Sequence, residues 1–162
     1  MRHTISVLVE NEFGVLSRVS GLFSGRGFNI ESLCVAETTD PQTSRMTIVT
    51  SGNEKILEQI EKQLNKLINV IKVVDHSDGQ SVERELVLIK VSAEPDTRAE
   101  ILRIVDIFRG KVVDVSPKTY TVEVTGSEGK IGAIVEMLKP LGIKEIARTG
   151  KIAMGRGGKV LK

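Results

Sequence analysis

The segment Val7-Leu8-Val9-Glu10-Asn11-Glu12-Phe13-Gly14-Val15-Leu16-Ser17-Arg18-Val19 decides the fold of the N-terminal part of the chain. Up to Val9 every second residue is a branched apolar one, which is the period of a β-strand. From Val15 onward apolar residues recur at the spacing of a helix that buries one face. The segment therefore predicts a strand, a tight loop and the start of a helix.

The loop between this strand and this helix has the features of a binding site. Asn11 and Gly14 lie where the first N–H groups of a new helix lack backbone partners, and such an end attracts an anion such as a carboxylate. A glycine in a first helical turn costs roughly 1 kcal/mol relative to alanine. Gly14 thus suggests that another group approaches the backbone closely. A plain helix-entry loop explains the same residues equally well.

Composition limits the class of protein. The 162 residues carry a formal net charge of +2, and aromatic residues make up only 3%, so we expect a core of Val, Ile and Leu. The single cysteine, Cys34, excludes an internal disulfide and fits a reducing compartment. No apolar run approaches the roughly 20 residues needed to span a bilayer, and the N-terminus lacks a signal-peptide pattern. We expect a soluble cytoplasmic protein.

Hydrophobic periodicity predicts the same element order, βαββαβ, twice along the chain. The first set comprises strand 5–9, helix 15–25, strands 28–36 and 45–50, helix 53–67 and strand 70–74. The second comprises strand 86–91, helix 95–109, strands 111–115 and 119–125, helix 131–138, stopped by Pro140 and Gly142, and strand 143–147. This order is ferredoxin-like. We therefore expect an α+β protein with domains at 1–76 and 83–162, a linker at 77–82 and a basic tail.

The sequence offers no constellation for catalysis. His3, His76 and Cys34 have no partners at metal-ligand spacing. No serine lies in a nucleophile elbow, and Gly150–Gly155 resembles a P-loop start but lacks the Lys-Ser/Thr ending and a following helix. We predict no catalytic residue and no metal site.

A polar pair remains, Asn11 and Asn29. In a βαββαβ sheet the strand order is typically 4-1-3-2, so the strand that follows Asn29 lies at an edge. If two copies pair there, or through their first helices, Asn29 of one approaches Asn11 and Gly14 of the other. Amide side chains both donate and accept, which suits an amino acid zwitterion. The predicted apolar lining consists of Val15, Leu16 and Ile30. The alternative, that both asparagines are ordinary turn and strand-entry residues, stays open.

Residues 6–33, SVLVENEFGVLSRVSGLFSGRGFNIESL, closely resemble the N-terminal segment of the regulatory (small) subunit of acetohydroxyacid synthase, also called acetolactate synthase. Further matching segments are Ser44–Ile48, Glu83–Leu86, Ile107–Val115 and Ala147–Gly150. The resemblance extends in order over nearly the whole chain, including the second predicted domain.

The resemblance implies that residues 1–76 form an ACT domain, an amino-acid sensor that binds its effector at the interface of a homodimer. It implies a non-catalytic chain that activates a catalytic large subunit and confers feedback inhibition, commonly by valine, in valine, leucine and isoleucine biosynthesis. Thiamine diphosphate, Mg2+ and FAD belong to that catalytic subunit in the family, and no cofactor is expected in this chain. Asn11 and Asn29 match the family's polar anchors, and Gly14 matches its loop glycine.

Two other functions were considered. A free-standing amino-acid-binding ACT protein would have no enzyme partner. An RNA-binding domain shares the βαββαβ order, but it stacks bases on aromatic residues of its central strands. Apart from Phe28, the first residue of strand 28–36, Tyr120 is the only aromatic residue inside a predicted strand here, so we expect no nucleic-acid partner and no membrane partner.

Overall fold

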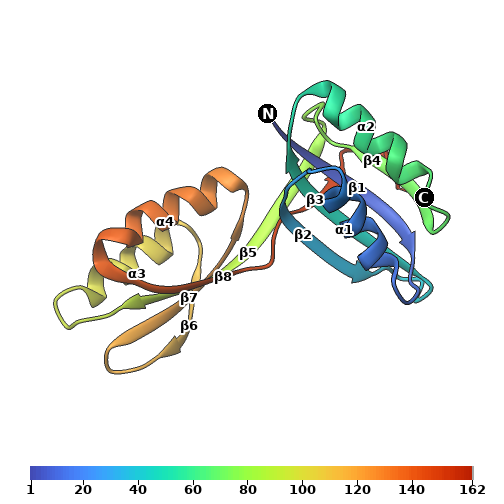
Figure 1. The fold of residues 1–162 in the computed structure, drawn as a ribbon. Helices are drawn as coiled ribbons and strands as arrows, with labels where there is room; N and C mark the ends of the chain where they lie inside the picture. The colour runs from blue at the N-terminus through green and yellow to red at the C-terminus, as the bar shows by residue number, and fades with distance from the viewer. Residues whose placement is uncertain (162) are drawn as a thin grey trace. The chain divides into compact units, whose positions relative to one another are not determined.

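The computed structural model describes residues 1–161 and divides into two compact units (Figure 1). The first comprises Met1–Val82 and the segment from Lys151 onward, and the second comprises Glu83–Gly150. Each unit has its own hydrophobic core, and each is described by itself below.

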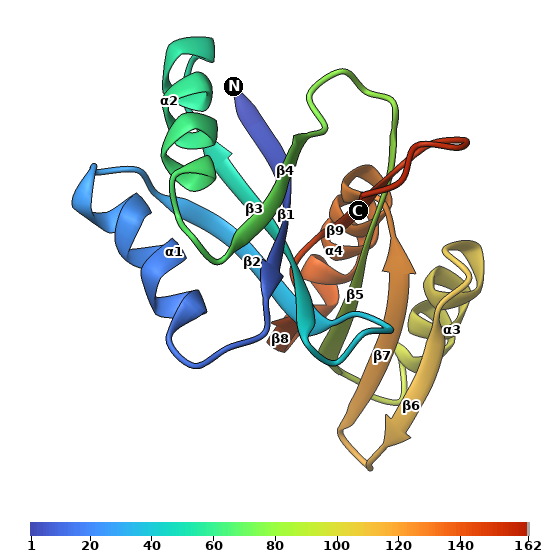
Figure 2. The ribbon, with the colours of Figure 1, turned by 90° about the vertical axis from the view of Figure 1, so that its right-hand side faces the viewer.

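The first unit is a four-stranded antiparallel sheet with two helices (Figures 1 and 2). Its elements are β1 Arg2–Glu10, α1 Val15–Gly25, β2 Ile30–Glu37, β3 Thr43–Ser51, α2 Glu54–Asn65 and β4 Val70–Asp75. The strand order is β2-β3-β1-β4, which confirms the predicted ferredoxin-like topology and places β2 at an edge.

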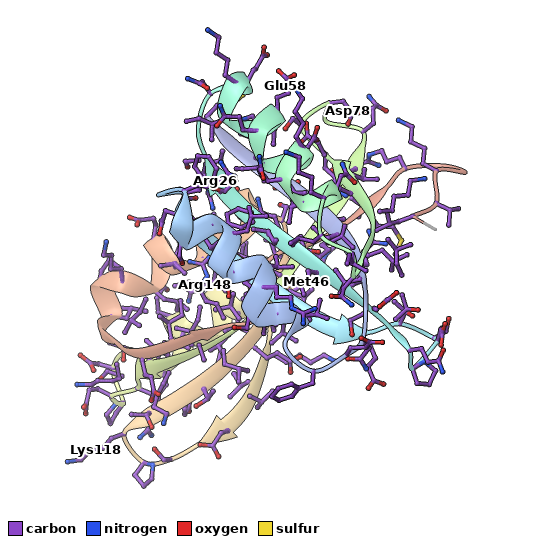
Figure 3. All side chains as sticks on the ribbon, turned by 45° about the vertical axis from the view of Figure 1, so that its right-hand side comes forward. Arg26, Met46, Glu58, Asp78, Lys118 and Arg148 are labelled. Atoms are coloured by element: carbon purple, nitrogen blue, oxygen red, sulfur yellow. The ribbon has the colours of Figure 1, made fainter. Side chains whose placement is uncertain are left out.

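Alternation along β1 sends Ile5, Val7 and Val9 into the core against the helices. Met46 of β3 is 2% exposed and joins them (Figure 3). Each such buried apolar side chain stabilises the fold by about 1.5–3 kcal/mol before entropy is counted. Asn53 is the N-cap of α2, and its side chain accepts the N–H of Ile56 at 3.0 Å, as expected of an asparagine before a helix.

The second unit repeats this topology. Its elements are β5 Ser81–Ser92, α3 Arg98–Ile107, β6 Lys111–Val115, β7 Thr119–Gly126, α4 Glu128–Gly142 and β8 Ile143–Arg148. The strand order β6-β7-β5-β8 is that of the first unit. The two-fold repetition predicted from the sequence is therefore present, although β5 already begins within the predicted linker.

Two expectations about the second half were wrong. Helix α4 runs through Pro140 to Gly142 rather than stopping before the proline. Proline lacks the backbone N–H that would donate to the carbonyl four residues earlier. Pro140 lies in the last turn, so the helix loses this one hydrogen bond only two residues before it ends. In addition, the tail assigned to the second domain forms strand β9, Ile152–Gly155, in the first unit. Its one buried side chain, Ala153, is too weak a pattern to predict this from sequence.

Candidate functional site

The loop between β1 and α1 is tied to the hairpin that joins β2 and β3. The backbone N–H of Asn11 donates to the carbonyl of Gln42 at 2.7 Å. Its side-chain amide donates to Oε1 of Glu37 at 3.1 Å and to the carbonyl of Pro41 at 2.9 Å. Asn11 is therefore more than a local turn residue, because it fixes two segments far apart in the sequence.

Gly14 is the N-cap of α1 and has φ 82° and ψ −3°, in the left-handed region. A Cβ built there would meet no atom within 4 Å. Glycine therefore suits the left-handed backbone conformation here, and the space beside it is open. No side chain caps α1, and its first turn contains no acidic residue. The positive end of the helix dipole is therefore left without a neutralising side chain.

A buried asparagine that the sequence analysis missed holds the same loop from its other side. Asn69 is 8% exposed, and its carbonyl accepts the N–H of Glu10 at 2.9 Å. Its Nδ2 donates to Oε2 of Glu10 at 2.9 Å, and its Oδ1 accepts from Arg18. A lone asparagine after a helix carries no sequence signal for such a role.

Asn29 lies elsewhere. It is exposed and directly precedes Ile30, the first residue of β2, and its carbonyl accepts from the Thr50 hydroxyl at 2.7 Å. Asn11 contacts Glu37, the last residue of β2. Eight residues of strand separate these positions, or roughly 25 Å at about 3.3 Å per residue. One copy of the chain does not bring Asn11 and Asn29 together.

The predicted apolar lining is only partly available. Leu16 is 45% exposed, and Ile30 is partly buried against the core. Val15 is 3% exposed and packs inside the first unit, and its place in the lining stays a prediction. Phe13, to which the sequence analysis gave no role, is fully exposed beside Gly14.

Within residues 1–161 no group of three or more His, Cys, Asp or Glu side chains is arranged to hold a metal ion. Over the same described residues, no helix is both long enough and apolar enough to cross a membrane.

Two family models match the chain in order. An acetohydroxyacid synthase (AHAS) small subunit-like ACT domain matches residues 5–72, and the small subunit of acetolactate synthase matches residues 84–157. The chain belongs to the acetolactate synthase small-subunit family. Its first unit contains the ACT domain.

Individual relatives agree with this membership over their full length. A probable acetolactate synthase small subunit of Archaeoglobus fulgidus is 56% identical over 98% of this chain and 99% of its own. The acetolactate synthase isozyme 3 small subunit of Escherichia coli is 51% identical over the whole of both chains. The crystal structure of the acetolactate synthase small subunit from Thermotoga maritima superposes with a TM-score of 0.89 at 43% identity, covering 98% of this chain and 99% of that one.

Proposed function

We propose that this chain is the regulatory subunit of an acetolactate synthase. It binds a separate catalytic large subunit, raises the activity of that subunit and makes it sensitive to valine or a related branched-chain amino acid. The family membership and the ACT domain support this proposal. Carboligation and its cofactors, thiamine diphosphate, Mg2+ and FAD, are assigned to the partner, and no residue of this chain is assigned a catalytic role.

The observation that carries the effector site is the placement of Asn11 and Asn29 at opposite ends of the edge strand β2. An edge strand presents unpaired N–H and C=O groups to a second strand. In an antiparallel pairing of β2 with β2 of a second copy, about a two-fold axis, the start of one strand meets the end of the other. Asn29 of one copy then lies beside Asn11 of its partner, and the homodimer contains two equivalent sites.

The outward face of α1 is compatible with a close approach of two copies. Ser17, Gly21 and Ser24 share one face of the helix at i, i+4 and i+7, and all three are exposed. Small residues on this face leave room for the same helix of a second copy, so pairing at β2 meets no bulky obstacle from this part of α1.

The groups at this site fit an amino acid. The carboxylate is placed at the N-terminal N–H groups of α1, beyond Gly14. Both amide hydrogens of Asn11 are engaged by Glu37 and Pro41, so the group that Asn11 can offer a ligand is its acceptor Oδ1. That oxygen and the Glu37 carboxylate suit an ammonium group. An apolar side chain of the ligand would contact Leu16 and Ile30.

Reconstitution with a catalytic large subunit tests the function. The rate of acetolactate formation is measured with and without this chain, and then across a valine titration. Activation together with inhibition by valine is expected, with a coupling free energy of about 1–3 kcal/mol between the two sites. Amino acid binding by the purified chain without any association with a large subunit would instead indicate a free-standing ACT sensor.

A further inference from the structure

The face of the first sheet that points away from the helices contains buried polar side chains. In the register of β1 with β3, Ser6 lies opposite Thr47, and Leu8 lies opposite Arg45. Ser6 is 0% exposed and Thr47 is 2% exposed. Buried polar groups are retained in folded proteins when they have hydrogen-bond partners. The hydrogen-bond partners of these buried polar side chains therefore show which segment of the chain binds to this face.

The central partner is the main chain of β9. The guanidinium of Arg45 donates to the carbonyl of Ala153 at 2.6 Å, and the hydroxyl of Ser6 donates to the same carbonyl at 3.4 Å. Arg45 also donates to Ser6 at 3.3 Å, and Ser6 lies 2.8 Å from Nε2 of His76. Burial lowers the pKa of Arg45 below its ordinary value. A partly buried guanidinium thus has a carbonyl of β9 as a charge-assisted partner.

Further contacts extend along the C-terminal segment. The N–H of Lys151 donates to the hydroxyl of Ser32 at 3.2 Å, on β2. At the other end, the N–H of Arg156 donates to the carbonyl of Gln80 at 3.0 Å, and Nζ of Lys159 lies 3.6 Å from Oδ2 of Asp78. The segment therefore crosses the sheet from the edge strand β2, over β3 and β1, to the turn after β4.

This surface recognises a backbone rather than a set of side chains. Within β9, Ala153 is 4% exposed, whereas its neighbours Ile152 and Met154 are 54% and 61% exposed. The face therefore accepts an extended segment with one small inward residue, whose carbonyl it binds. The strand pairing of β9 is with β5, which begins at Ser81.

The contact with β2 connects this surface to the effector site. Ser32 follows Asn29 by three residues, and the register of β2 with β3 shifts between Ile30 and Ser32. Since β2 pairs in this chain with β3 alone, the irregular start of β2 has few backbone constraints. The hydrogen bond from the N–H of Lys151 to the hydroxyl of Ser32 adds a side-chain constraint there, at the end of the strand that follows Asn29.

We propose that this face is the docking surface of the chain's own C-terminal strand, and that docked β9 holds the start of β2 in the conformation that the effector requires. The statement that docked β9 affects effector binding rests on the proposed function. The main chain of residues 151–156, more than a hundred positions from Asn29 in sequence, and the buried side chain of Ala153 thereby become part of the regulatory apparatus.

The test compares Arg45→Met with Arg156→Met in the full-length chain. The first substitution removes the donor to Ala153, and the second removes an exposed side chain on the same segment. Hydrogen exchange is followed for peptides covering residues 151–156 and 30–37. Valine affinity is measured by calorimetry. Arg45→Met is expected to speed exchange in both peptides and to weaken valine binding by between about twofold and thirtyfold, while Arg156→Met leaves both unchanged.

A second pair guards against a general folding defect of Arg45→Met. Ala153→Leu overfills the buried position, whereas Met154→Leu changes an exposed one. The proposal is overturned if β9 exchanges freely while β2 exchange and valine affinity stay at their wild-type values, or if neither Arg45→Met nor Ala153→Leu releases β9. If the wild-type chain binds no branched-chain amino acid, the proposed function fails. In that case the inference is decided by hydrogen exchange alone: release of β9 must speed the exchange of the peptide covering residues 30–37.

Discussion

The side-chain amide of Asn11 donates to Oε1 of Glu37 at 3.1 Å, which joins the loop after β1 to the last residue of β2. Asn29 precedes the first residue of the same strand. The two polar anchors of the proposed site thus belong to opposite ends of one edge strand. A site that needs both is incomplete in one copy of the chain and requires a second.

Mixed dimers test this arrangement. Asn11→Ala and Asn29→Ala should each abolish effector binding as homodimers, because each damages both sites. When the two variants are unfolded together and refolded, each mixed dimer has one site with both defects and one site with both asparagines intact. Valine binding measured by calorimetry should therefore return in part. If each site lay within a single chain, mixing would restore nothing.

Gly14→Asp and Gly14→Asn separate charge from backbone strain. At φ 82° both side chains encounter the left-handed penalty, roughly 1–2 kcal/mol for an ordinary residue and less for Asn and Asp. The two variants should therefore unfold at similar denaturant concentrations, slightly below wild type. Only aspartate adds a negative charge at the helix end where the effector carboxylate is placed.

Gly14→Asp should consequently still activate the catalytic subunit while its valine inhibition midpoint rises at least about tenfold, which is 1.4 kcal/mol of binding free energy. Gly14→Asn should shift that midpoint much less. The inhibition curve of the reconstituted enzyme provides the measurement. Equal midpoints for the two variants would show that charge at Gly14 does not act on the effector.

The sequence predicted the parts of the fold that depend on repeated side-chain patterns. Leu57, Ile60 and Leu64 are the buried stripe of α2, and a stripe of this kind is visible because each turn of the helix repeats it. The cap Asn53 was predictable because an asparagine directly before a helix commonly accepts a backbone N–H of the first turn. The edge position of β2 followed from the topology alone.

The parts that the sequence did not predict depend on the backbone or on single contacts. Glycine at position 14 has a positive φ, which residue identity alone does not distinguish from a close approach of another group. The docking of β9 rests on the carbonyl of Ala153, and every residue has a carbonyl. Asn69 acts through contacts with residues more than fifty positions away, so no local pattern marks it.

Asn69→Ala should destabilise the first unit. The substitution leaves Glu10 and Arg18 without their buried amide partner, at a cost of about 1–3 kcal/mol. Chemical denaturation gives the free energy of unfolding. Asn65→Ala, an exposed position at the end of α2, is the matched control and should change it by less than about 0.5 kcal/mol. Equal effects of the two variants would mean that the side-chain contacts of Asn69 with Glu10 and Arg18 contribute no stability.

The last prediction concerns the pH dependence of stability. Burial, followed by the neighbouring carboxylates Asp75 and Glu58, raises the pKa of Glu61 on α2 above its ordinary value of 4.5. The folded state therefore binds this proton more tightly than the unfolded state, and its contribution to stability falls as pH rises from the ordinary pKa through the raised one. Glu61→Gln removes that loss, so the variant should be more stable than wild type at pH 7. Because Glu61 is partly exposed, the gain should stay below about 1 kcal/mol. Below the ordinary pKa the glutamate is protonated in both states, and the difference should vanish.

Glu58→Gln on the same helix is the control with the opposite sign. Its hydrogen bond and ion pair with Lys62, at 2.8 Å, lower the pKa of Glu58. A lowered pKa stabilises the fold above the ordinary value and loses that contribution as pH falls through the folded pKa. Glu58→Gln should therefore lower stability slightly at pH 7, where Glu61→Gln raises it. Thermal unfolding of wild type and both variants between pH 3.5 and pH 7.5, a range of about four units around the ordinary carboxylate values, provides the comparison. A stability gain for Glu61→Gln that persists unchanged at the acidic end would show that it comes from side-chain packing and not from the charge.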